Sequence, residues 1–207
     1  MRVGLIVDSA CDLPYEFSRK HDLFVLPVTA VIDGQTYIDK HDPVRTQEFY
    51  QSGLLQKGHQ AETRAFTAEQ IHDLFMEKIV TQFDIAICET VTKSRSLIFQ
   101  NATEAMNSVL ANYEGAREAA GRDGRFFMRV IDSKQIFAGQ GLLAAHTLKL
   151  IGQNVSKNAL RHEVETFSDK IYTCVIPRDL HYIRERARRR GDKSVSALVA
   201  FLGKALN

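Results

Sequence analysis

The chain opens with an apolar run that leads into a polar cluster, residues 3–14, VGLIVDSACDLP. Residues 3–7 are apolar without alternation, which is typical of a strand buried on both faces of a sheet. Asp8 and Ser9 stand where this strand is expected to end. A buried first strand of this kind favours a parallel sheet covered by helices on both sides.

Strand and helix patterns alternate along the rest of the chain. The predicted strands span residues 3–7, 23–32 with an interruption at Pro27, 36–38 after the turn Asp33-Gly34, 85–88, 126–131 and 171–176. One predicted helix follows the capping box Thr67-x-x-Gln70, and three others span residues 96–113, 139–150 and 156–167. A cationic helix is predicted to begin near Arg178. This order predicts an α/β fold, a parallel sheet with helices on both faces.

The same pattern predicts two domains. Residues 1–152 are expected to form the parallel α/β domain, and residues 153–207 the start of a second α/β domain. The second part holds one clear strand, and one strand cannot make a sheet, so we expect this domain to be incomplete.

Composition places the chain among soluble proteins with a core, because 44% of its residues are hydrophobic and 25% are charged. No run approaches the roughly 18 apolar residues of a membrane-spanning helix, so we expect no membrane insertion, at most transient contact, and a cytoplasmic location. Cys11, Cys88 and Cys174 are far apart, which favours reduced thiols over a disulfide framework or a zinc site.

The net charge of +2 hides a basic segment, since residues 178–193 hold seven basic and three acidic residues. A run of this kind can bind phosphates. It has few interleaved aromatic residues, however, and a charged helix is more often solvated or a docking face for a protein. We therefore expect no nucleic-acid partner.

Polar clusters follow three of the predicted strands: Asp8-Ser9, residues 90–96, and Asp132-Ser133. An α/β sheet places its ligands beyond the carboxyl ends of its strands. Hydroxyls and cations at residues 90–96 precede a predicted helix, and a helix N-terminus favours an anion. The same residue types are also common turn and helix caps, so the structural interpretation stays open.

Motifs of several enzyme classes are absent from the sequence. There is no P-loop, no G-x-S-x-G elbow, no H-E-x-x-H pair, and Gly139-x-Gly141 lacks the third glycine of a dinucleotide fingerprint. An enzyme acting on a small phosphorylated or carboxylated ligand near Asp8, Ser96 and Asp132 remains an alternative, although no base and nucleophile pair can be named.

Three separated segments resemble the DegV family. Residues 7–14, VDSACDLP, are similar to its opening DS-x-x-DLP signature. Pro27-Val28 and the pattern of residues 33–39, DGQTYID, resemble its next stretch. Residues 130–133, VIDS, with Gly139 and Gly141 behind them, resemble its VIDS…G-x-G segment.

This resemblance implies a two-domain protein that holds one long-chain fatty acid in an inter-domain cleft, without a cofactor or chemistry of its own. Some members of the family carry the acyl chain for a separate fatty acid kinase subunit. In the family, two loops usually bind the carboxylate, and their hydroxyls correspond here to Thr63 and to Ser96 with Thr92. Neither metal nor catalytic residues are implied.

The chain departs from the family pattern in both loops. Residues 64–66, RAF, replace Ser-Gln-Pro, and Leu97-Ile98 replace Gly-Thr. Arg64 and Arg95 add charge beside the expected carboxylate site, and arginine recognises carboxylates well. We expect the bulk of Leu97 and Ile98 to narrow or redirect the acyl tunnel. The family also continues well beyond residue 207.

Overall fold

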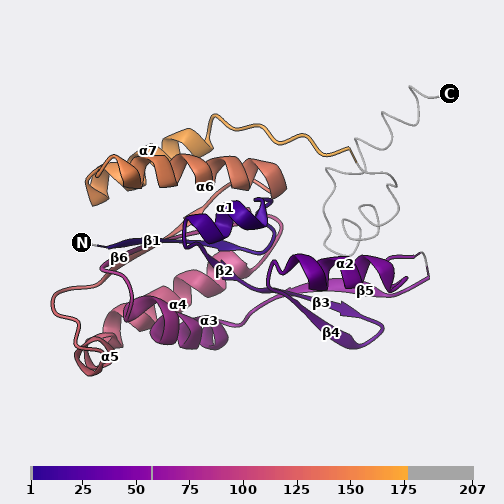
Figure 1. Cartoon of the computed structure of the whole chain (residues 1–207), viewed down its shortest axis with the longest axis horizontal. Coiled ribbons are helices and arrows are strands. Elements are labelled where there is room, and N and C mark those ends of the chain that lie inside the picture. Colours follow the sequence, from indigo (N-terminus) through magenta and orange to yellow (C-terminus); the bar gives the residue numbers. More distant parts are fainter. Residues whose placement is uncertain (1, 57, 177–207) are drawn as a thin grey trace. The chain divides into compact units, whose positions relative to one another are not determined.

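Four parallel strands, in the order β2-β1-β6-β7, form the main sheet of the computed structural model (Figure 1). Their bounds are Val3–Asp8 for β1, Phe24–Leu26 for β2, Ile85–Thr90 for β6 and Phe127–Asp132 for β7. The structure describes residues 2–56 and 58–176. The chain divides into two units, Met1–Thr173 and Cys174–Asn207, and the sheet belongs to the first.

Helices cover both faces of this sheet, which confirms the predicted fold class (Figure 1). α3 (Ala68–Phe75) and α4 (Ile98–Asn112) pack on one face, and α6 (Phe137–Gly152) and α7 (Lys157–Ser168) lie on the other side. Because side chains alternate along a strand, Ile6 enters the core with α3 and α4, while Leu5 enters the core with α6. The unalternating apolar run at the start of the chain therefore fills two cores at once.

A second, antiparallel sheet follows Pro27, which separates β2 from β3 as the sequence predicts. Its strand order is β4-β3-β5, with β3 at Val28–Ile32, β4 at Gln35–Asp39 and β5 at Ala61–Ala65. Asp33 and Gly34 both have positive φ, 49° and 81°, as the tight turn between β3 and β4 requires. α2 (Pro43–Gln51) is capped by Asp42, and Phe49 of α2 makes an edge contact with Tyr37 of β4.

The capping box at Thr67 and Gln70 starts α3 as predicted, and the chain then continues into a π-helical turn, η1 (Met76–Val80). Four elements were not predicted from the sequence. They are α1 (Tyr15–Lys20), α2, β5 and α5 (Glu114–Ala119). α1 and α5 have six residues each, too few for a helical period to stand out.

The predicted strand at residues 171–176 is wrong, because the structure has no regular secondary structure there. Tyr172 and Ile176 are 88% and 96% exposed, and β-prone residues form a strand only where a neighbouring strand pairs with them. The predicted cationic helix and the basic segment 178–193 lie outside the described residues. The domain limits 1–152 and 153–207 stay a prediction. Within the described ranges, no helix is long and apolar enough to cross a bilayer.

Candidate functional site

The carboxyl ends of β1, β6 and β7 lie side by side, since parallel strands end at the same edge of a sheet. The register pairs Val7 with Glu89 and Thr90 with Asp132. The three polar clusters expected from the sequence therefore meet at one edge, where an α/β sheet places its ligands.

Asp8 is completely buried at this edge, and both of its oxygens accept hydrogen bonds from backbone N–H groups. Oδ1 accepts from Ala10 at 3.0 Å, and Oδ2 accepts from Val91 at 2.5 Å. Burial raises the pKa of Asp8 to about 6, and the bonds from Val91, Ala10 and the Gln140 side chain only partly oppose this. Ser9 has a structural contact, because its Oγ accepts the N–H of Val28 at 3.0 Å at the start of β3.

The segment after β6, residues 91–96, is here called the site loop. Its backbone is tied to the β7 side by Thr92, whose N–H donates to the Gln135 carbonyl at 2.9 Å, and by Lys93, whose N–H donates to Asp132 Oδ1 at 3.2 Å. Asp132 Oδ1 also accepts the N–H of Lys134 at 3.0 Å.

Ser133 is buried behind the site loop. Its hydroxyl donates to the Gln135 carbonyl at 3.2 Å, and its carbonyl accepts the Ser168 hydroxyl at 2.9 Å. These contacts belong to the packing of β7 against the start of α6 and the end of α7. Asp8, Ser9 and Ser133 are therefore buried within the protein.

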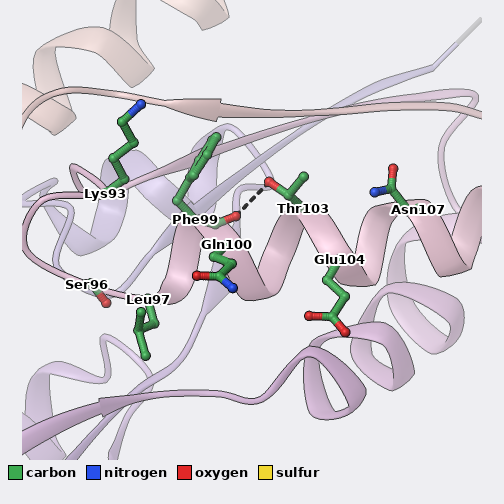
Figure 2. Close-up of a pocket in the computed structure, with 8 residues that line it drawn as sticks. All are labelled: Lys93, Ser96, Leu97, Phe99, Gln100, Thr103, Glu104 and Asn107. Atoms are coloured by element: carbon green, nitrogen blue, oxygen red, sulfur yellow. Dashed lines mark hydrogen bonds between the residues drawn. The ribbon is translucent and has the colours of Figure 1, made fainter.

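Ser96 lies at the end of the site loop, directly before α4, and its Oγ accepts the Ile98 N–H at 3.3 Å. The N-cap residue of α4, Leu97, makes no capping bond itself, and the Ser96 hydroxyl accepts the N–H of the first helical residue in its place. Ser96 also borders an open groove of about 570 Å³ that follows the first turns of α4 (Figure 2). The groove is lined by Lys93, Ser96, Leu97, Phe99, Gln100, Thr103, Glu104 and Asn107.

The two bulky residues that replace Gly-Thr have different positions. Ile98 is completely buried in the core between the sheet and α3 and α4, so its bulk fills the core. Leu97 is 65% exposed and lines the groove. Only Leu97 can therefore affect a ligand in the groove directly. Thr92, whose hydroxyl lies 3.3 Å from that of Ser94, is half-buried in the site loop, as is Arg95.

Thr63 and Arg64 lie in β5, where the sequence suggested a loop. Thr63 pairs with Ala30 of β3, and the Arg64 guanidinium forms an ion pair with Glu62, with Nε 2.6 Å from Oε1. The end of this segment reaches α4, because the Asn101 amide donates to the Phe66 carbonyl at 2.6 Å. This hydrogen bond connects the segment that follows Thr63 with the segment that follows Ser96, the two segments to which the resemblance assigns the carboxylate.

A buried polar group between β6 and α6 was not predicted from the sequence. Glu89 is completely buried, accepts a hydrogen bond from the Thr147 hydroxyl of α6, and has its backbone carbonyl bonded to Gln140 Nε2 at 3.2 Å. Burial raises the pKa of Glu89 to about 8. Within the part of the chain that the structure describes, Glu89 Oε2, Gln140 Oε1 and Thr90 Oγ1 have no hydrogen-bond partner. The sequence signal was a glutamate within the apolar run of β6.

The thiols at this edge are not suited to nucleophilic chemistry. Cys11 and Cys88 are buried and free, and burial raises the pKa of both thiols, so they stay protonated. Cys174 is free and exposed. In residues 2–56 and 58–176, no three His, Cys, Asp or Glu side chains are grouped as metal ligands.

Comparison with known proteins identifies relatives of the whole chain. Residues 2–207 match the model of a protein family described as "Uncharacterised protein, DegV family". A DegV domain-containing protein of Xanthomonas axonopodis pv. citri is 42% identical over all 207 residues, and a second one from Xanthomonas campestris pv. campestris is 41% identical. The chain spans 66% of the length of each of these two relatives, slightly less than two thirds.

Solved structures share the fold. DegV of Bacillus subtilis, described as a fatty acid binding protein, superposes with a TM-score of 0.71 at 18% identity, over 98% of this chain and 64% of its own. A stearic acid-binding protein of Eubacterium ventriosum superposes with a TM-score of 0.65 at 27% identity, over 79% of this chain and 52% of its own.

Proposed function

This chain belongs to the DegV family, and from that premise we propose that it binds a long-chain fatty acid whose carboxylate lies at the start of α4. The observation that carries the proposal is the position of Ser96, which borders the groove and lies directly before α4, where its hydroxyl accepts the N–H of Ile98. The solved relatives from Bacillus subtilis and Eubacterium ventriosum, described as binding a fatty acid and stearic acid, support the choice of ligand.

The residues around Ser96 suit a carboxylate. The first N–H groups of a helix and its dipole favour negative charge, and Lys93 on the groove wall adds a cation. In the proposal, the hydroxyls of Ser96 and Thr92 donate to the carboxylate. Thr63, Arg64 and Arg95 complete the carboxylate-binding set, with Arg64 exchanging its ion pair to Glu62 for the ligand.

The acyl chain is proposed to follow the groove along α4. Each methylene removed from water contributes about 0.8 kcal/mol. Leu97 is the exposed apolar residue of the groove, and the acyl chain would cover it.

The alternative, an enzyme or regulator for a small phosphorylated or carboxylated ligand, has less support. Asp8 and Ser133 are buried, and their polar atoms bond to the protein. The thiols of Cys11 and Cys88 are buried and protonated. We therefore propose a binding role without catalysis and without a cofactor.

A carrier of this kind needs a partner, and we propose that it presents the fatty acid to a kinase subunit in the cytoplasm. The three free cysteines are those expected of a reducing compartment. The proposed dock is the basic segment 178–193. A pull-down of the kinase subunit should succeed with the unaltered chain and fail when Arg188 and Arg189 are both replaced by Glu.

Mass spectrometry of organic extracts from the purified protein tests the ligand directly. We expect a long-chain fatty acid in native preparations, and saturable uptake of added oleate or palmitate after delipidation. A protein that carries no acyl chain and takes up neither fatty acid contradicts the proposal.

The double variant Thr63→Ala with Ser96→Ala tests the carboxylate site. Loss of hydrogen bonds to a charged group costs about 1.5–3 kcal/mol, so oleate should bind roughly 10- to 100-fold more weakly. The matched control is Thr81→Ala, which removes a hydroxyl bonded to the Glu77 carbonyl at the opposite edge of the sheet and should leave affinity unchanged.

A further inference from the structure

The backbone of the site loop is held by two carboxylates that lie on either side of it. Of its first three N–H groups, that of Val91 donates to Asp8, that of Thr92 to the Gln135 carbonyl, and that of Lys93 to Asp132. Asp8 ends β1 and Asp132 ends β7, the two strands that flank β6. The loop that leads to Ser96 is therefore fixed from both neighbouring strands.

The two carboxylates hold the loop in different ways. Asp8 uses both oxygens, one for Ala10 and the other for Val91. Asp132 uses a single oxygen, Oδ1, for the N–H groups of both Lys93 and Lys134. Each carboxylate thus links the site loop to the loop that follows its own strand.

Burial makes the position of Asp8 informative. A carboxylate with no exposed surface loses its hydration, and only hydrogen bonds from the protein compensate for that loss. Here two of those bonds come from the backbone N–H groups of Ala10 and Val91, which lie in two different loops. The observed loop conformation therefore stabilises the buried carboxylate, and the carboxylate in turn stabilises the loop conformation.

We propose that Asp8 and Asp132 are positioning residues of the fatty acid site, which set the site loop so that Ser96 and the first turn of α4 meet the carboxylate. This inference rests on the proposed function and adds to it residues that make no contact with the ligand. The position of Ser96 depends on the hydrogen bonds that the N–H groups of Val91 and Lys93 donate to these carboxylates, because those bonds fix the loop that leads to Ser96.

The geometry predicts opposite outcomes for the same substitution at the two positions. Asp132→Asn keeps an amide oxygen in the place of Oδ1, so it should still accept both N–H groups and bind oleate within about threefold of the unaltered chain. Asp132→Ala removes the acceptor and should weaken binding about tenfold or more. Asp8→Asn must place an NH₂ group against the N–H of Ala10 or Val91, so this conservative change should weaken oleate binding about tenfold or more.

Amide hydrogen exchange without ligand at pH 7 reads the loop itself. In Asp132→Ala we expect Lys93 and Lys134 to exchange about tenfold or more faster, whereas Asp132→Asn should leave them unchanged. In Asp8→Asn the faster amides should be Val91 and Ala10. Each change should be local, with the amides of β6 remaining protected.

Asp84→Asn is the matched control, because Asp84 also accepts a backbone N–H but lies just before the amino end of β6. It should lower stability and leave exchange in the site loop and oleate affinity unchanged. Equal loss of affinity in Asp84→Asn and in the two loop variants would overturn the inference, as would unchanged exchange at Val91 in Asp8→Asn or at Lys93 in Asp132→Ala. If the unaltered chain binds no oleate, the proposed function fails, whereas the exchange data still decide whether the carboxylates set the loop.

Discussion

Buried polar groups lie at both ends of β6, but different interactions compensate for their lost hydration at the two ends. At the amino end, Asp84 accepts hydrogen bonds from the Arg2 N–H and from the guanidinium groups of Arg117 and Arg122. Arg117, only 2% exposed in its side chain, also donates to the carbonyls of Val80 and Phe83. The N–H of Arg2, followed by the two guanidinium groups, lowers the pKa of Asp84.

At the carboxyl end, within residues 2–56 and 58–176, neither Asp8 nor Glu89 forms an ion pair with a lysine or arginine. Burial raises the pKa of Asp8 to about 6 and that of Glu89 to about 8, and the partners of both are hydroxyl, amide and backbone groups. The amino end is thus built around ion pairs, whereas polar groups at the carboxyl end hold loops. The proposed site lies at the second end.

Replacing Arg117 with Met should have the largest effect on the comparison. The variant leaves Asp84 without its most buried partner and the carbonyls of Val80 and Phe83 without donors. Asp84 is 28% exposed and keeps Arg122 and the Arg2 N–H, so the main cost is that of the buried carbonyls left without donors, about 1–3 kcal/mol each, and urea unfolding measures it. Arg161→Met is the control, because its ion pair with Glu165 is exposed and should change stability by less than about 0.5 kcal/mol. Equal losses in both variants would show that the amino end is not a special ion pair.

Glu89→Gln tests the opposite end through pH. The pKa of Glu89 is raised in the folded state, so the folded chain keeps a proton that the unfolded chain has lost, and stability should fall as pH rises through about 8. Between pH 6 and pH 9 this fall should be on the order of 3 kcal/mol in the unaltered chain, at about 1.4 kcal/mol per pH unit up to the folded pKa. The variant should lack most of it. Urea unfolding at several pH values measures the slope, and an unchanged slope contradicts the assignment.

Arg122→Ala should have the smallest effect. The Arg122 side chain is 32% exposed, and Asp84 keeps Arg117 and the Arg2 N–H in its absence. A partly exposed ion pair contributes about 0–1 kcal/mol, so the loss should stay within that range and shrink in high salt. A loss of stability as large as that of Arg117→Met would show that the partly exposed pair of Arg122 with Asp84 stabilises the amino end as much as Arg117 does.

The main sheet and the helices α3, α4, α6 and α7 that pack on its faces could be predicted because their signals are local. The apolar run at residues 3–7, the break at Pro27 and the capping box at Thr67 each depend on neighbouring residues alone. The exposed strand β5, AETRA, has no apolar pattern, and it forms because β3 offers an edge. Residues 171–176 show the reverse case. Their sequence is β-prone, but within the described residues no strand pairs with them, so they form no strand.

The candidate site divides in the same way. The strand-end clusters at Asp8 and Asp132 could be predicted, since the carboxyl ends of parallel strands meet at one edge. Which of the clusters faces solvent could not be predicted, because this depends on how the site loop packs against the neighbouring segments. Asp8 and Ser133 are buried, and Ser96 borders the groove.

The α/β order of elements, the buried first strand and the resemblance to the DegV family follow from the sequence alone, because periodicity, caps and motifs are local features of the chain. Three findings required the folded chain: Thr63 lies in a strand, Ile98 fills the core while Leu97 lines the groove, and Glu89 is buried beside Thr147. The physical reason is that burial and hydrogen-bond partners arise from residues far apart in the chain. The charge state of a carboxyl group follows from that environment rather than from its neighbours in sequence.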